Sequence, residues 1–128
     1  MSEPVDLRAR VTEYVEAINT RDASVIADQF SPDAVQADPV TNPPNVGRDA
    51  ITAFFEAGIG ASDTWRFAAK QVHTCGQHVA IDFEIEVVTG GGTMTIDGIE
   101  VFTADDHGRF TSAHAYWDEA DLTFGPEA

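Results

Sequence analysis

The chain has 128 residues, 43% of them hydrophobic, and its seven basic and 22 acidic side chains give a formal net charge of -15 at pH 7. This size and apolar content suit one globular domain over residues 1–128, and the negative charge argues against nucleic acid and anionic membranes as partners. The single cysteine allows no internal disulfide, and neither Met1–Arg10 nor any later segment has the apolar run of an export signal or a membrane span. We therefore expect a cytoplasmic protein.

The first half of the chain carries helical patterns. Apolar residues from Leu7 to Ile18 recur at steps of three and four, which predicts an amphipathic helix whose inner face includes Tyr14. Asp22 is a suitable N-cap, so a second helix is expected from Ala23 to Phe30. A third opens at 47–49 and closes at 58–60. Between the last two we expect an extended run over 34–38 and a loop over 40–46.

After residue 64 the hydrophobic period changes to two, which is typical of strands with one buried face. The predicted strands cover residues 65–72, 79–87, 93–104 and 110–117. Helices followed by a strand meander predict an α+β fold in which three N-terminal helices pack in a strongly curved antiparallel sheet. Such a sheet leaves a cone-shaped hydrophobic pocket.

The histidines and the thiol offer little chemistry. His73, Cys75 and His78 could be read as a metal site, but His78 lies beyond a turn and no fourth ligand is nearby, so we expect no metal. His114 fits a surface or interface position better than a catalytic base. A nucleophile motif is missing, and the glycines at 90–92 join two strands instead of opening a phosphate-binding helix.

Three oxygen-bearing side chains remain as candidates for acid-base chemistry. Tyr14 on an apolar helix face is either a packing residue or a hydrogen-bond donor. Asp38 before Pro39 either caps a turn or acts as a base. Glu100 shares its strand face with apolar residues, although the opposite face, with Ile99 and Val101, is also partly apolar. A carboxyl group buried there would have a raised pKa and could donate a hydrogen bond at neutral pH.

With these residues in view, the chain resembles the bacterial steroid Δ5-3-ketoisomerase (ketosteroid isomerase) family, within the larger NTF2-like class of cone folds. The likeness covers nearly the whole chain. The matching pieces are Glu13-Tyr14-Val15-Glu16-Ala17, Asp33-Ala34-Val35-Gln36-Ala37-Asp38-Pro39, Pro43-Pro44, Gly47-Arg48, Ile99-Glu100-Val101, Asp106-His107-Gly108-Arg109, and Ala115-Tyr116-Trp117 with Glu119 and Leu122.

The resemblance implies a cofactor-independent steroid isomerase. Asp38 would be the general base and Tyr14 an oxyanion donor, and Glu100 would stand where the family has a neutral aspartic acid. Ketosteroid isomerase is itself the standard example of a base paired with a protonated acid. The positions of the tyrosines that support the catalytic tyrosine in some members are Phe30 and Phe55 here.

The same resemblance implies which residues line the pocket and how the protein assembles. Phe54, Phe83 and Trp117 match steroid-lining residues, with Ala113 and Ala115 expected on the same face of the last strand as Trp117. We expect a small hydrophobic ketone such as a steroid as the partner, no nucleic acid, no membrane, no metal, and a homodimer built on the sheet face. A related lyase, cyclase or hydrolase acting on another hydrophobic ketone or epoxide is the alternative, as is a non-catalytic ligand-binding module.

Overall fold

A computed structural model describes residues 5–125, so the first four residues of the stretch Met1–Arg10 lie outside it. The described part of the chain contains three α-helices in its first half: α1 (Leu7–Thr20), α2 (Ala23–Ala27) and α3 (Arg48–Gly60). The strands and a 3-10 turn are β1 (Phe30–Ala37), β2 (Asn45–Val46), β3 (Thr64–Cys75), β4 (His78–Thr89), β5 (Gly92–Ala104), β6 (Phe110–Tyr116), η1 (Glu119–Asp121) and β7 (Leu122–Gly125). Among these residues no helix is both long and apolar enough to cross a membrane.

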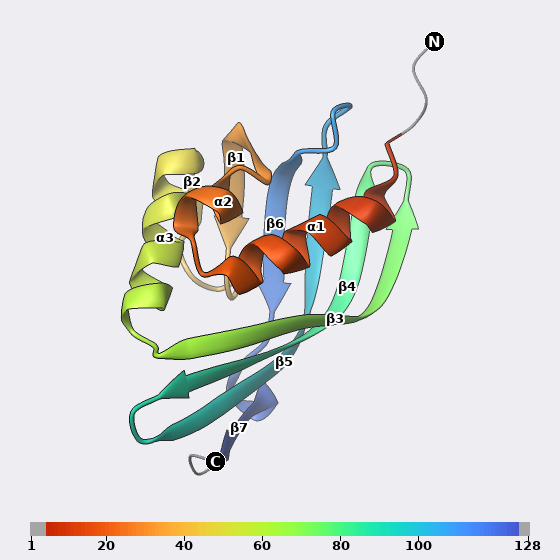
Figure 1. Cartoon of the computed structure of the whole chain (residues 1–128). Coiled ribbons are helices and arrows are strands. Elements are labelled where there is room, and N and C mark those ends of the chain that lie inside the picture. The colour runs from red at the N-terminus through yellow and green to blue at the C-terminus, as the bar shows by residue number, and fades with distance from the viewer. Residues whose placement is uncertain (1–4, 126–128) are drawn as a thin grey trace.

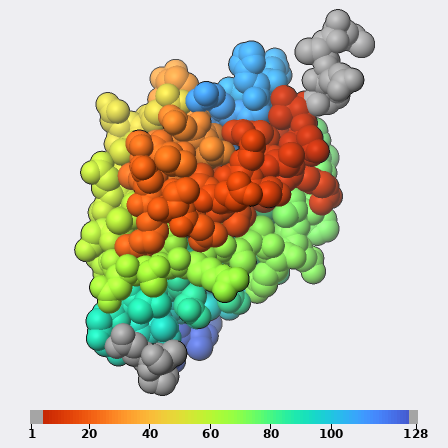
Figure 2. Space-filling model, in the orientation of Figure 1, coloured from red at the N-terminus to blue at the C-terminus, as the bar shows by residue number. Residues whose placement is uncertain are grey.

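The strands form one sheet in the order β2-β1-β6-β5-β4-β3, and β7 pairs with the first half of β5. The helices lie against one side of this sheet, and β3, β4 and β5 curve beyond them (Figure 1). On the face seen in Figure 2, α1 lies beside β3. The expected fold, an α+β cone in which three helices pack in a strongly curved sheet, is confirmed.

The second helix is shorter than the pattern predicts. It is capped by Asp22, whose carboxylate accepts from the backbone of Ser24 and Val25, but it ends at Ala27 and not at Phe30. The reason lies in the sheet, where Phe30 pairs with Phe110 and the Gln29 carbonyl accepts from the Phe110 N–H at 3.0 Å. A backbone already bonded to β6 cannot continue a helix, so the prediction of a helix to Phe30 is wrong.

The four predicted long strands pair antiparallel, as expected, and the described sheet also contains one parallel pair. β1 runs parallel to β6, while the other strand pairs are antiparallel. β1 and β6 are far apart in the sequence, so no hairpin turn fixes their relative direction. In addition, β1 begins at Phe30 and not at Ala34, and the expected loop after it contains β2.

Candidate active site

A cavity of about 380 Å³ lies between the helices and the concave face of the sheet. This volume is in the range of small-molecule binding sites. The lining is mostly apolar and comes from α1, α3, the three long strands, and the residues that follow α3, β1 and β6. Its aromatic residues are Tyr14, Phe54, Phe55, Trp65, Phe67, Phe83 and Trp117.

Strand register organises the floor of this cavity into rows. Paired residues of β3, β4 and β5 share a row, and two complete rows line the cavity: Trp65-Val87-Met94 and Phe67-Ile85-Ile96. Glu100 lies on the same face of β5 as Met94, six residues further along, or about 20 Å of extended backbone. The cavity thus runs from a polar inner end at Glu100 to an apolar outer end at the Trp65 row.

A glycine on this floor makes room for an aromatic ring. A Cβ atom at Gly98 would lie 2.9 Å from Phe83 Cζ and 2.8 Å from the Tyr116 carbonyl oxygen. The missing side chain therefore lets the Phe83 ring lie close over β5. Sequence reasoning missed this role, although a glycine inside a strand commonly marks a close approach of another group.

Tyr14 projects from α1 into the inner end of the cavity and is 2% exposed. Its ring packs edge-on against four phenylalanines, with ring centroids 5.1–6.0 Å apart: Phe30, Phe67, Phe102 and Phe110. Phe30 has no hydroxyl group, so it contacts Tyr14 without a hydrogen bond. Phe55 lies against Phe54 on the cavity wall. Burial raises the Tyr14 pKa, and the nearby Glu100 and Asp38 charges raise it further, so the phenol stays protonated and can donate.

Asp38 follows the end of β1, is half-buried and lines the same cavity. Its Oδ1 accepts a 2.6 Å hydrogen bond from Trp117 Nε1, and a 2.7 Å bond from Val40 N to Ala115 O fixes the backbone that follows. Burial raises the Asp38 pKa, and the Trp117 bond partly opposes that rise. The Asp38 carboxylate is therefore a partly desolvated hydrogen-bond acceptor whose position is fixed. Sequence reasoning placed Trp117 only in the apolar wall, although a buried indole N–H requires a partner.

Glu100 points inward from β5 and is 4% exposed. Within residues 5–125 its carboxyl group and the Tyr14 hydroxyl have no hydrogen-bond partner. Neither group is fully enclosed by protein, since the enclosed side-chain atom without a partner in this part of the chain is Arg48 Nε. The Tyr14 and Glu100 oxygens therefore open onto the cavity. Burial raises the Glu100 pKa well above its usual value and the Asp38 charge adds to the rise, which favours the neutral acid.

The structure brings most of the predicted site residues together. Tyr14, Asp38, Glu100, Phe54, Phe83 and Trp117 line one cavity. Ala113 and Ala115 do not join this lining; both are fully buried in β6, where they pair with Phe102 and Glu100. Paired residues point to the same side of a sheet, so both alanines face the concave side together with Phe102 and Glu100, but they do not border the cavity.

The remaining candidates lie elsewhere. His114 is half-buried on β6 and pairs with Val101. His73, Cys75 and His78 lie where β3 turns into β4, and Cys75 is exposed with a free thiol. Residues 5–125 contain no group of three or more histidine, cysteine or acidic side chains placed to hold a metal ion.

A curled sheet wrapped around helices, with a cavity of this kind, defines the NTF2-like class of cone folds. The SnoaL-like domain family matches residues 11–113. A steroid delta-isomerase from Nocardioides simplex is 31% identical over 121 residues, which cover 94% of this chain and 97% of that protein. The chain belongs to the SnoaL-like family, and its resemblance to ketosteroid isomerase is confirmed.

Several solved structures share the fold. SalBIII, an epoxide hydrolase/cyclase-like enzyme of pyran ring formation in the polyether salinomycin, has a TM-score of 0.84 at 22% identity over 93% of this chain and 95% of its own. RV0760c from Mycobacterium tuberculosis gives 0.85 at 18% identity over 98% and 100%. A computationally designed 17-OHP binder gives 0.82 at 18% identity over 93% and 98%.

Proposed function

We propose that this protein is a steroid delta-isomerase that moves the double bond of a 3-oxo-Δ5-steroid, or of a similar enolisable hydrophobic ketone, into conjugation. One observation carries the proposal: the inner end of an apolar cavity holds the Asp38 carboxylate, fixed by Trp117, and two buried acids, Tyr14 and Glu100, that have no hydrogen-bond partner among residues 5–125. The 31% identity to a steroid delta-isomerase supports the reaction class.

In the proposed reaction Asp38 removes a proton from the carbon between the ketone and the double bond. The C–H electron pair forms a dienolate whose negative charge lies on the ketone oxygen. Tyr14 and neutral Glu100 donate hydrogen bonds to that oxygen, and preorganised donors in a dry site can lower such a barrier by several kcal/mol. The protonated Asp38 then returns the proton at the far end of the dienolate, so the reaction is balanced without a cofactor.

The environment of Asp38 suits a proton that must be taken and given back. Partial burial raises its pKa, which makes the carboxylate a stronger base than one in water, while the Trp117 N–H keeps one oxygen fixed. The unbonded Oδ2 is then the atom that exchanges the proton. A neutral, largely apolar substrate is unaffected by the strong negative charge of the chain.

We also propose that the protein works as a cytoplasmic homodimer. The outer face of the sheet presents apolar side chains of adjacent strands: Ile99 is 44% exposed, Val101 36% and Tyr116 51%. Ile99 and Tyr116 are paired across β5 and β6, so they form one continuous patch suited to a second copy of the same face. Light scattering of the purified protein measures this state.

A second candidate reaction is epoxide opening. Here Glu100 would protonate the epoxide oxygen while Asp38 takes the proton of the attacking water or hydroxyl group, so a new C–O bond replaces the broken one. The glutamic acid at position 100, one methylene longer than the aspartic acid of the isomerases, favours keeping this candidate, and the SalBIII fold likeness is compatible with it.

The test is turnover of 5-androstene-3,17-dione, followed by the ultraviolet absorbance of the conjugated ketone. We expect rapid conversion that added chelator does not alter. If the steroid is bound but not converted, while a hydrophobic epoxide is opened, the second candidate is correct. Binding of a steroid with turnover of neither compound would identify a ligand-binding module.

A further inference from the structure

Arg21 occupies an unusual place at the end of α1. It is the C-cap residue and has φ 55° and ψ 34°, the one non-glycine residue with a positive φ among residues 5–125. A side chain raises the free energy of this left-handed conformation, which is why glycine is common at such caps. The reason for an arginine at this position should therefore lie in the contacts of its side chain.

The Arg21 guanidinium joins the end of α1 to the end of α3. Its Nη1 donates to Ser62 Oγ at 3.0 Å, and its Nη2 donates to the carbonyl oxygens of Ile59 at 3.2 Å and Ser62 at 3.0 Å. These acceptors lie in the last turn of α3 and just after it, where a helix leaves carbonyl groups without partners. Three bonds from one planar fork fix both the position and the orientation of this segment.

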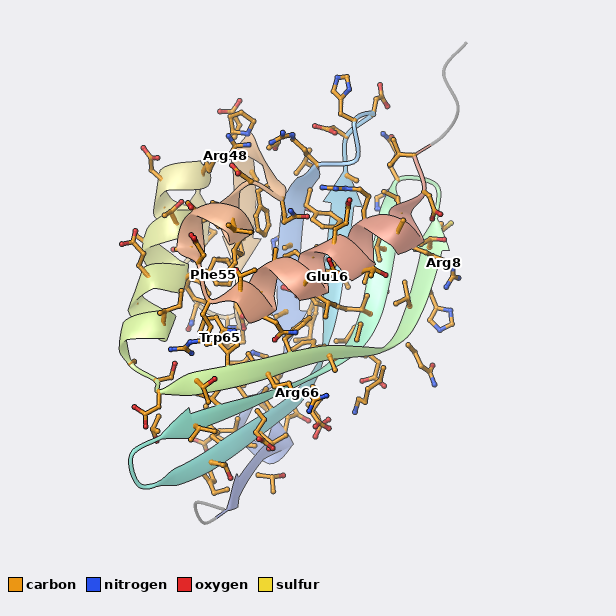
Figure 3. All side chains as sticks on the ribbon, in the orientation of Figure 1. Arg8, Glu16, Arg48, Phe55, Trp65 and Arg66 are labelled. Atoms are coloured by element: carbon orange, nitrogen blue, oxygen red, sulfur yellow. The ribbon has the colours of Figure 1, made fainter. Side chains whose placement is uncertain are left out.

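The same guanidinium lies over an aromatic side chain of the cavity. Its central carbon is 4.8 Å from the centroid of the Trp65 ring, a cation-π distance, and Trp65 Nε1 donates at 2.7 Å to the Ile18 carbonyl of α1. Figure 3 shows Trp65 close to the C-terminal end of α1. Arg21 thus fixes one face of a ring that belongs to the outermost row of the floor.

The segments that Arg21 joins form the outer end of the cavity. Ile18, Gly58, Ser62 and Trp65 all line it, whereas Arg21 itself does not. The Trp65 ring also closes against α3, since a Cβ atom at Gly58 would lie 3.5 Å from its Cζ3. The catalytic candidates stand at the opposite end, beyond the two floor rows.

We propose that Arg21 is a positioning residue that holds the outer wall of the cavity together and thereby gives the site its affinity for polycyclic ligands. This inference rests on the proposed function only where turnover is the readout. A ligand of several fused rings extends from Glu100 towards the Trp65 row and needs that wall. A ligand of one or two rings stays at the inner end and does not.

The experiment compares Arg21→Gly, Arg21→Lys and a control, Arg66→Gln, which removes a positive charge from the exposed surface of β3. Glycine suits the left-handed backbone, so Arg21→Gly should fold. With 5-androstene-3,17-dione we expect about a tenfold higher KM in Arg21→Gly and a kcat within about twofold of wild type, because the reacting atoms are untouched. Arg21→Lys should recover part of the loss, and Arg66→Gln should show none.

Two further measurements do not depend on turnover. In Arg21→Gly the dissociation constant of estradiol, with four rings, should rise about tenfold, and that of 2-naphthol, with two, should stay within about twofold. Hydrogen exchange should become faster at amides 58–65 and stay unchanged at amides 99–104. If the wild-type protein binds estradiol but does not convert 5-androstene-3,17-dione, the proposed isomerase function is wrong. The role of Arg21 is then tested by these two measurements alone. Equal losses for both phenols, or unchanged exchange at 58–65, would overturn the positioning role.

Discussion

Tyr14 shows how one residue can serve both packing and chemistry. Its ring is held by four phenylalanines, but its hydroxyl opens onto the cavity beside Glu100 and Asp38. Tyr14→Phe keeps the ring and removes the donor. We expect kcat to fall by about two to three orders of magnitude, the range for loss of one oxyanion donor, with little change in thermal stability.

The other tyrosine of the chain is the matched control for this variant. Tyr116 lies on the outer face of β6 away from the cavity, and phenylalanine keeps the ring that the proposed dimer patch uses, so Tyr116→Phe should retain wild-type turnover. An early-melting Tyr14→Phe protein with full specific activity would instead make Tyr14 a packing residue only.

In the proposed reaction Glu100 contributes to catalysis only as a neutral acid. Glu100→Gln keeps a donor at the same length, so it should lose less activity than Glu100→Ala. Infrared difference spectra of wild type against Glu100→Gln should contain a protonated carboxyl band at neutral pH. A carboxylate band, with the Gln and Ala variants equally active, would leave Tyr14 as the remaining donor of the pair.

The sequence predicts those single residues whose position follows from the hydrophobic period or from the family likeness. Two-residue spacing along β5 put Glu100 on the inner face, and the structure agrees. The Trp117 to Asp38 hydrogen bond joins residues that are distant in the sequence, and no local pattern encodes such a contact. The same holds for the Arg21 contacts with the end of α3.

Among the strands, β5 carries part of the cavity floor together with β3 and β4, and Gly98 sets how closely Phe83 packs on it. In Gly98→Ala the new methyl group would meet the Phe83 ring and the Tyr116 carbonyl at under 3 Å. We expect a loss of about 1–3 kcal/mol in the free energy of unfolding, as for overpacked sites, together with weaker steroid binding as the ring shifts into the cavity. Denaturant unfolding and estradiol titration measure the two effects.

Another glycine provides the comparison. A Cβ atom at Gly91 would meet nothing within 4 Å, so Gly91→Ala should leave stability and binding nearly unchanged. Equal behaviour of the two variants would show that the close approach at Gly98 has no consequence.

Element type was easier to predict than element ends or strand direction. A helical period identified α1, and a two-residue period identified the long strands, because these elements carry several turns or alternations of buried side chains. The glycines at 47, 58 and 60 marked the two ends of α3. The end of α2 and the parallel pairing of β1 are decided by hydrogen bonds to β6, about eighty residues further on. Such pairing depends on the assembled sheet and leaves no mark in the local pattern.

At the scale of the whole molecule, the buried acid has a pH-dependent effect on stability. Because the folded-state pKa of Glu100 is raised, the folded protein binds more protons than the unfolded chain at pH values between the unfolded pKa, about 4.3, and the folded pKa. The free energy of unfolding therefore falls as pH rises between these two values, by about 1.4 kcal/mol for each pH unit that separates them.

Glu100→Gln removes this loss. Its melting temperature relative to wild type should increase from pH 4 upwards and then level off above the folded pKa of Glu100. Glu56→Gln, at an exposed position of α3, should follow wild type. A difference between Glu100→Gln and wild type that does not change with pH would mean that Glu100 is not a desolvated acid.

Whether this cavity isomerises a ketone with Asp38 as the base is tested by Asp38→Asn. The amide keeps the size of the side chain but cannot take a proton, so kcat should fall by about three orders of magnitude or more while estradiol still binds. Asp33→Asn makes the same change at an exposed position of β1 and should remain fully active. Turnover of 5-androstene-3,17-dione by Asp38→Asn above about a tenth of the wild-type rate would show that Asp38 is not the base.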